Sequence, residues 1–223
     1  MRKIVVGAQV SLDGIMQAPG GPSEDPTNGF KFGGWAMPYF DEAAGEEIDR
    51  LFARTFDLLL GRKPYEIFAA YWPYQGEDAP AADIAKLFNR ITKYVVSRSG
   101  EVDLGWAGTV LVRDIAGVKR LRDADGSDLV TQGSTELVHA LLGEDLVDAI
   151  SIFTMPVVLG GGKKLFADGE APHAFTLTGS RVSESGVVVG HYERDGAVKT
   201  GNAAPGSPSA REIARQERMK REG

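Results

Sequence analysis

The residues best suited to chemistry in this chain are cations that directly follow an apolar strand. The stretch DLLLGRKPYE (57–66) runs into Gly61 and then into Arg62 and Lys63, with Pro64 near the first position of the next helix. The first N–H groups of a helix have no partner within it and carry a partial positive charge. Two cations beside them suit a phosphate, although solvated turn residues would show the same pattern.

Two other strand ends carry hydroxyl groups and a further guanidinium. The strand in YVVSRS (94–99) ends in Ser97, Arg98 and Ser99. The segment TQGSTELVHALL (131–142) passes through Gly133 into a helix that opens with Ser134, Thr135 and Glu136. Ligands of open α/β sheets bind at the carboxyl ends of the strands, so these groups also suit a phosphate. Polar turn residues and a well-capped helix remain open explanations of each pattern taken alone.

The chain lacks the residues or the spacing that most other kinds of catalysis need. The chain has no cysteine, which excludes disulfides, thiolate catalysis and cysteine-ligated zinc. Its three histidines, at 139, 173 and 191, are not at metal-ligand spacing, so no metal site is predicted. No serine lies in a G-x-S-x-G turn. Asp13 and the acids around 41–47 could act as general acids, but carboxylates in loops and first helical turns are usually solvated or capping.

Composition narrows the range of partners. The 223 residues fit one domain with a tail, and the formal net charge of −6 argues against nucleic-acid binding, which usually needs a basic field. No window of about 18 apolar residues exists, so no membrane-spanning helix is expected. The N-terminus lacks the apolar region and cleavage site of a signal peptide. We therefore expect a cytoplasmic protein with neither a membrane nor a nucleic acid as partner.

The order of apolar segments predicts an α/β fold. Strands alternate with helices up to about residue 160, and two strands then flank Ser185 and Gly186 within 175–194. This order is typical of a mostly parallel sheet that carries an antiparallel edge. The strands before residue 175 are expected at 3–14, 56–61, 93–99, 109–114, 128–133 and 148–161, and the helices at 40–55, 63–72, 82–91, 115–124 and 134–145.

Two segments stand outside this alternation. Residues 16–38 are dense in glycine and proline, and a loop of that length in a compact domain indicates a functional segment such as a lid over a ligand. Residues 195–210 have the composition of a flexible linker, and 210–222 read as a charged helix with few apolar anchors. We expect one domain at 1–194, followed at 195–223 by a linker and a tail that is a solvated appendage or an oligomer arm.

Taken in order, these motifs resemble the dihydrofolate reductase-like superfamily, in particular the reductase (C-terminal) domain of riboflavin biosynthesis. The resemblance covers about residues 2–193. It rests on AQVSLDG (8–14), AMPYFDEA (36–43), LLLGRKPYE (58–66), YVVSRS (94–99), TQGSTELVHALL (131–142) and LVDAISIFTMPVVLGGGKKLF (146–166). It implies a three-layer α/β/α fold, with a mostly parallel central sheet and an antiparallel C-terminal strand, and a homodimer.

The resemblance also implies NADPH as cofactor and assigns roles around it. The adenosine 2′-phosphate falls on the first two strand ends, at Gly61, Arg62, Lys63, Ser97, Arg98 and Ser99. The pyrophosphate falls on the third, at Gly133, Ser134, Thr135 and Glu136. The nicotinamide carboxamide would meet the backbone near Ala8 and Gln9, and the loop 15–38 would cover the nicotinamide and a small heterocyclic substrate.

The activity implied is that of an NADPH-dependent oxidoreductase, similar to dihydrofolate reductase or 5-amino-6-(5-phosphoribosylamino)uracil reductase. A hydride would pass to a C=N or C=O of a pterin-like or aminopyrimidine substrate, with the proton taken from water, Asp13 or Glu47. Dihydrofolate reductases carry a carboxylate in the first helix, and the corresponding place here is Ala43 or Ala44. A non-catalytic nucleotide-binding or oligomerising module that keeps the fold is therefore the alternative.

Overall fold

Apolar strands covered on both faces form the centre of the molecule. The computed structural model describes residues 1–203 and 206–222. The strands are β1 (Ile4–Ser11), β2 (Phe56–Gly61), β3 (Lys93–Val96), β4 (Thr109–Val112), β5 (Asp128–Thr131), β6 (Ala149–Met155), β7 (Phe175–Val182) and β8 (Val188–Arg194). The helices are α1 (Glu42–Phe52), α2 (Arg62–Ala69), α3 (Ala82–Arg90), α4 (Ile115–Asp123), α5 (Thr135–Gly143) and α6 (Ala210–Glu222).

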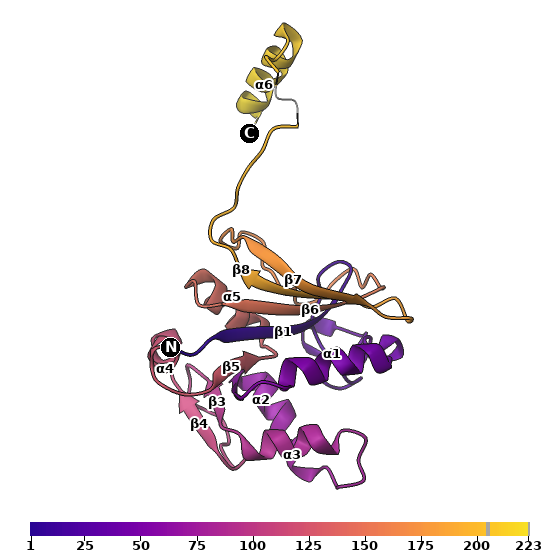
Figure 1. Ribbon diagram of the computed structural model, residues 1–223, viewed down its shortest axis with the longest axis vertical. Coiled ribbons are helices and arrows are strands. Elements are labelled where there is room, and N and C mark those ends of the chain that lie inside the picture. Colours follow the sequence, from indigo (N-terminus) through magenta and orange to yellow (C-terminus); the bar gives the residue numbers. More distant parts are fainter. Residues whose placement is uncertain (204–205, 223) are drawn as a thin grey trace.

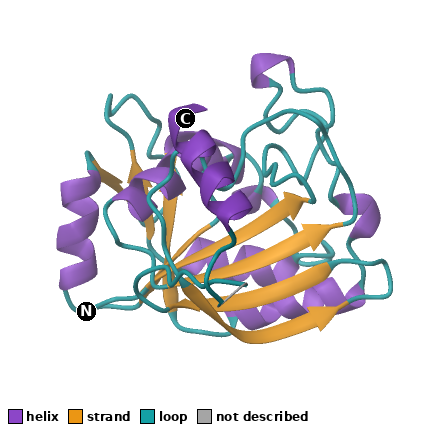
Figure 2. Cartoon of the chain, turned by 90° about the horizontal axis from the view of Figure 1, so that it is seen from above, coloured by secondary structure: helices purple, strands orange, loops and turns teal. Residues whose placement is uncertain are grey.

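All eight strands belong to one sheet, in the order β4-β3-β2-β5-β1-β6-β8-β7 (Figures 1 and 2). Strands β1 to β6 pair in parallel with one another, whereas β8 pairs antiparallel with both β6 and β7. The predicted α/β fold, with a mostly parallel sheet and an antiparallel C-terminal strand, is confirmed.

Alternate residues of the central strand β1 face opposite helical layers. Val5 belongs to a core with side chains of α1, α2 and α3, whereas Ile4 and Val6 belong to a second core with side chains of α4 and α5. Successive side chains of a strand point to opposite faces, so a continuous apolar run supplies both cores. The three-layer α/β/α arrangement implied by the resemblance is confirmed (Figure 1).

The structure corrects several predicted boundaries. The strand expected at 148–161 ends at Met155, because Pro156 has no N–H to donate to a neighbouring strand. The helix expected at 63–72 covers Arg62–Ala69, and Trp72–Tyr74 form a separate 3-10 turn. Pro73 explains why α2 does not continue, since proline has no N–H to donate to the carbonyl oxygen of Ala69.

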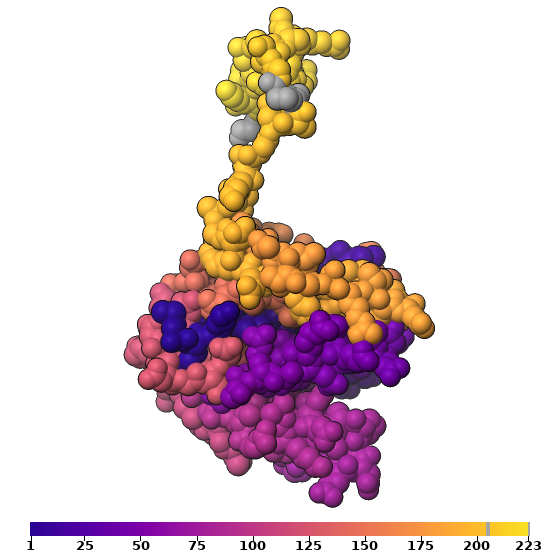
Figure 3. Space-filling model, in the orientation of Figure 1, coloured from indigo at the N-terminus to yellow at the C-terminus, as the bar shows by residue number. Residues whose placement is uncertain are grey.

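The C-terminal segment projects from the rest of the protein. Helix α6 buries none of its residues, and Figures 1 and 3 show it held away from the sheet by an extended stretch of chain. Among the described residues, no helix has the length and apolar character needed to cross a membrane.

Candidate functional site

The parallel order of the sheet brings three strand ends to one edge. Strand β2 lies between β3 and β5, so Gly61, Ser97 and Gly133 follow neighbouring strands. They line a groove of about 1660 Å³. All the residues assigned to the cofactor from the sequence lie along this groove: Ala8, Gln9, Gly61, Arg62, Lys63, Ser97, Arg98, Ser99, Gly133, Ser134, Thr135 and Glu136.

The turns that open α2 and α5 touch each other. The N–H of Gly61 donates to the carbonyl oxygen of Gly133 at 3.1 Å. A Cβ atom at position 61 would lie 2.5 Å from Ser134 Oγ, so this contact requires a glycine. Gly133 has a φ of +120°, which disfavours any residue with a side chain. The unpaired N–H groups of two helix starts therefore lie close together at the edge of the groove.

Three cations lie beside these helix starts, in different states of pairing. The guanidinium of Arg62 donates to both carboxylate oxygens of Glu66, at 2.9 and 3.0 Å. Arg98 is 89% exposed and comes within only 4.0 Å of Glu136. Within the described ranges, no carboxylate lies at ion-pair distance from Lys63. Exposed pairs of this kind contribute little free energy, so the cations are available to an anion in the groove.

The central strand offers an open backbone edge to the same groove. Strand β1 pairs with β5 only through Ile4–Val6, but with β6 as far as Ser11. Beyond Val6, the edge of β1 that faces β5 therefore has no strand partner in the part of the chain that the structure describes. Ala8 and Gln9 lie on this stretch and line the groove. Their peptide groups could hydrogen-bond a planar amide, as the resemblance implies for a carboxamide.

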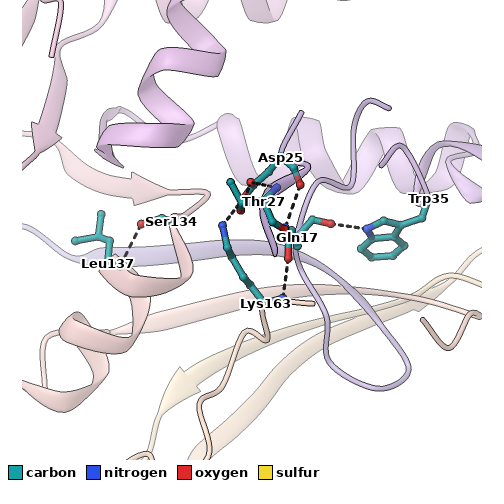
Figure 4. A network of polar contacts seen from close by, with 7 residues as sticks. All are labelled: Gln17, Asp25, Thr27, Trp35, Ser134, Leu137 and Lys163. Carbon is teal, nitrogen blue, oxygen red and sulfur yellow. Dashed lines mark hydrogen bonds and ion pairs between the residues drawn. The ribbon is translucent and has the colours of Figure 1, made fainter. Parts of the chain in front are cut away.

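The long loop before α1 forms one wall of the groove and is fastened by Gln17 (Figure 4). The side-chain amide of Gln17 donates to the carbonyl oxygens of Asp25 and Thr27, both at 3.0 Å, and accepts from the N–H of Lys163 at 3.0 Å. The indole N–H of Trp35 donates to the carbonyl oxygen of Gln17 at 2.8 Å. The Lys163 ammonium is paired with the Asp25 carboxylate. The loop expected as a lid over a ligand is thus held in place by these contacts as a wall of the groove.

The far part of the groove is apolar, which the sequence reasoning did not foresee. Six of its lining residues come from α1, α2, α3 and the turn after α2: Ile48, Phe52, Phe68, Trp72, Ile84 and Phe88. The ring centroids of Phe52, Phe68 and Trp72 lie 5.2, 5.8 and 5.1 Å from that of Phe88. The density of aromatic residues between 65 and 74 was the available signal.

The two residues suggested as proton donors lie outside the groove lining. Asp13 Oδ1 accepts from Ser11 Oγ at 2.6 Å and from the N–H of Leu159 at 3.1 Å, and Oδ2 accepts from the N–H of Gly160 at 2.8 Å. These hydrogen bonds, that of Ser11 foremost, lower the pKa of Asp13 to about 2. A carboxyl held so firmly in its ionised form ties two loops together and is a poor proton donor.

Glu47 points to the opposite end of the sheet from the three strand ends. Its side chain is 1% exposed, and Oε2 lies 2.9 Å from Nε2 of His191 on β8. Arg181 on β7 lies 3.6 Å from its other oxygen. The Nδ1 atom of His191 is 2.9 Å from Ser151 Oγ on β6. Glu47 therefore joins α1 to the C-terminal strands, and the structure argues against its assignment as proton donor.

Carboxyl groups that the sequence analysis did not assign also line the groove, and Glu24 is the one with a raised pKa. Glu24 lies in the loop wall, and its Oε2 accepts from the N–H of Gly20 at 2.6 Å and of Gly21 at 3.0 Å. Burial raises the pKa of Glu24. Among the residues that the structure describes, no three acidic or histidine side chains gather to hold a metal ion.

Comparison with known proteins agrees with this geometry. Residues 2–189 match the family described as the RibD C-terminal domain. The chain is 27% identical over 203 residues to the uncharacterized protein YyaP of Bacillus subtilis (strain 168), a match that covers 87% of this chain and 96% of that protein.

Two solved structures share the fold. A putative riboflavin biosynthesis protein from Shewanella sp. PV-4 aligns with a TM-score of 0.59 and 21% identity, over 86% of this chain and 99% of that one. A dihydrofolate reductase from Enterococcus faecalis complexed with NADP(H) aligns with a TM-score of 0.53 and 11% identity, over 86% of this chain and 96% of that one. At these identities the likeness shows the fold alone.

Proposed function

The chain belongs to the RibD C-terminal domain family, and on this premise we propose that it is an NADPH-dependent reductase. The observation that carries the proposal is the groove in which two helix starts and three cations meet at the strand ends. A protein of the same fold is a dihydrofolate reductase complexed with NADP(H), which supports a nicotinamide cofactor. NADPH, when bound, supplies a hydride to a C=N or C=O carbon of a small heterocycle.

The cations divide the groove into ends of different charge. Arg62, Lys63 and Arg98 would hold the 2′-phosphate, with Ser97, Ser99 and Gly61 lining the same end. The helix start at Gly133, Ser134 and Thr135 would receive the pyrophosphate, and Glu136 would orient Arg98. The open edge of β1 at Ala8 and Gln9 would receive the carboxamide.

The proton that follows the hydride has two sources in this arrangement. Water reaches the groove, and Glu24 lines it with a carboxyl whose pKa is raised by burial, so that its protonated form is favoured relative to an exposed glutamate. Asp13 and Glu47 take no part, because their oxygens are committed to partners outside the groove.

The cofactor assignment is tested by binding to wild type and to Arg98→Ala. Charged hydrogen bonds contribute about 1.5–3 kcal/mol, so loss of Arg98 should weaken NADPH binding by about 10- to 100-fold and leave NADH unchanged. Arg90→Ala, at an exposed position outside the groove lining, is the matched control and should alter neither affinity. Equal losses for both cofactors in Arg98→Ala would overturn the 2′-phosphate assignment.

Turnover separates the enzyme from a non-catalytic nucleotide-binding module. NADPH oxidation is followed at about 340 nm with a panel of pterins, flavins and aminopyrimidines. Oxidation that depends on both the protein and one of these compounds supports the reductase. Tight NADPH binding without turnover on any of them would instead favour the module.

We also propose that the protein forms a homodimer through its C-terminal strands. Leu177, Val182 and Val188 on β7 and β8 are 51%, 69% and 47% exposed. Strand β7 is the last strand of the sheet, and an exposed apolar edge favours pairing with another chain. Light scattering of the wild type should give twice the mass of one chain, and light scattering of Val182→Asp should give the mass of a single chain.

A further inference from the structure

We propose that the substrate of this reductase is a neutral, flat and largely apolar heteroaromatic molecule rather than a phosphorylated one. The inference deepens the proposed function and rests on it. It arises from the contrast between the two ends of one groove, since the cations gather at the strand ends and aromatic side chains line the part beneath α1, α2 and α3.

The aromatic wall is built to receive a ring. Phe88 lies at its centre, stacked at 13° on Phe68 and met edge-on by Phe52 and Trp72. Because each ring is held by its neighbours, the wall keeps its shape when a ligand binds. A flat aromatic ligand placed against it loses apolar surface to the protein on its face and edges, and aromatic pairs add to that gain.

A substrate phosphate would find no free cation at this end. Among the described residues, the lysines and arginines that line the groove are Arg62, Lys63, Arg98 and Lys163, and the imidazole of His139, on α5, is bonded to the carbonyl oxygens of residues 164 and 165. The first three lie at the strand ends, where the cofactor would engage them, and Lys163 is already paired with the Asp25 carboxylate. An ionised phosphate brought against apolar side chains without a partner loses its hydration at a cost of several kcal/mol.

A cationic or strongly polar ring would also find few partners against this wall of the groove. The residues that α1 presents to the groove are Ile48 and Phe52, while the neighbouring Glu47 is committed to His191. Glu24, on the loop side, has one carboxylate oxygen committed to the N–H groups of Gly20 and Gly21, and burial raises its pKa. The substrate end therefore has an aromatic and aliphatic wall beneath α1, α2 and α3, and its polar groups lie on the loop side, where Asp25 and Lys163 are paired with each other. This arrangement fits an uncharged ring with a C=N or C=O.

The reaction balances with groups already named. The hydride forms a C–H bond at the substrate carbon as the π pair of the C=N or C=O moves to nitrogen or oxygen, which takes a proton from water or Glu24. NADPH is oxidised to NADP⁺, and the substrate is reduced by two electrons.

Binding of three related flavin-type compounds tests the inference. Lumichrome is neutral, riboflavin is neutral with a polyol chain, and FMN adds a phosphate to that chain. The quenching of their fluorescence is measured with the protein saturated with NADP⁺, so that the cations of the nucleotide end are occupied. We expect lumichrome to bind at least ten-fold more tightly than FMN. An FMN affinity equal to or above that of lumichrome would overturn the inference.

Two variants place the binding on the aromatic wall. Ile84→Lys, on α3, and Ile48→Lys, on α1, each introduce a cation at a groove-lining position of the apolar wall, away from the start of α2. Each should weaken lumichrome at least five-fold and narrow the gap to FMN, with NADP⁺ affinity unchanged. Ile213→Lys, on the exposed tail helix, is the control and should change nothing. Unchanged lumichrome affinity in a variant that still binds NADP⁺ would refute the assignment.

The assays distinguish an error in the substrate class from an error in the proposed reductase function. If NADP⁺ and NADPH bind but FMN is preferred, the substrate class is wrong and the reductase stands. If neither nucleotide binds, the proposed function itself is wrong, whatever the flavin compounds do.

Discussion

Replacing Gly61 with alanine tests the contact on which the groove depends. The backbone at Gly61 has φ −67° and ψ 161°, which alanine adopts without strain. The added Cβ would lie 2.5 Å from Ser134 Oγ, 3.0 Å from its backbone nitrogen and 3.1 Å from its Cβ. The hydroxyl can rotate away, but the other two atoms belong to the start of α5 and must move with the backbone.

The magnitude follows from two effects. Overpacking of a closely packed site costs about 1–3 kcal/mol. Ser134 Oγ also caps α5 by accepting from the N–H of Leu137 at 3.4 Å, and loss of such a cap costs about 1 kcal/mol. We expect Gly61→Ala to lower the free energy of unfolding by about 2 kcal/mol, and to weaken NADPH binding because the two helix starts separate.

Urea denaturation of Gly61→Ala and Gly45→Ala is the assay. Gly45 lies within α1, and a Cβ added there would have no atom within 4 Å, so alanine should stabilise the protein by about 0.8–1 kcal/mol through helix propensity. The two substitutions add the same methyl group and are expected to act in opposite directions. A Gly61→Ala protein as stable as the wild type would refute the steric argument.

Three further predictions concern the loops and the tail. Asp13→Asn should lower the free energy of unfolding by about 1 kcal/mol at neutral pH. Because the folded pKa of Asp13 is lowered to about 2, this contribution is present above the unfolded pKa of about 4 and fades as the pH falls towards 2. The difference from wild type in urea denaturation should therefore be smaller at pH 3 than at pH 7. Gln17→Ala removes the side chain that fastens the loop and should speed amide hydrogen exchange in residues 16–38 without a similar effect in β1; uniform exchange across both would contradict the assigned role. Removal of residues 197–223 should leave the melting temperature unchanged, because α6 buries no residue and the cut spares the backbone hydrogen bonds of Asp195 and Gly196 with Ala174. A fall of several degrees would show that the tail stabilises the domain.

The strand ends of the candidate site could be predicted because their signals are local. The turn and the helix start after a strand can be recognised within a few residues, as at Gly61 and Arg62 after one strand and at Gly133 and Ser134 after another. The alternation of strands and helices likewise predicts a parallel sheet, and in such a sheet all carboxyl ends meet at one edge. The residues that line the groove at the three strand ends could therefore be named from the sequence.

The partners of individual side chains could not be predicted in this way. Asp13 is of a residue type that can act as a general acid, but its carboxylate accepts hydrogen bonds from the N–H groups of Leu159 and Gly160, which lie far along the chain. Glu47 stands in the first helix near the expected acid, but one residue of helical rotation turns it towards His191 and leaves Ile48 in the groove. No local pattern encodes such a choice.

By itself, the sequence determined the class of fold, the helix starts at the strand ends and the cations and hydroxyl groups beside them. Only the tertiary structure decided that Gly61 touches Ser134, that the long loop is fastened to Lys163, and that the far end of the groove is an aromatic wall. The reason is one of range. Backbone propensities, caps and hydrophobic periodicity act over a few residues, whereas the charge and shape of a binding groove depend on which distant segments pack side by side.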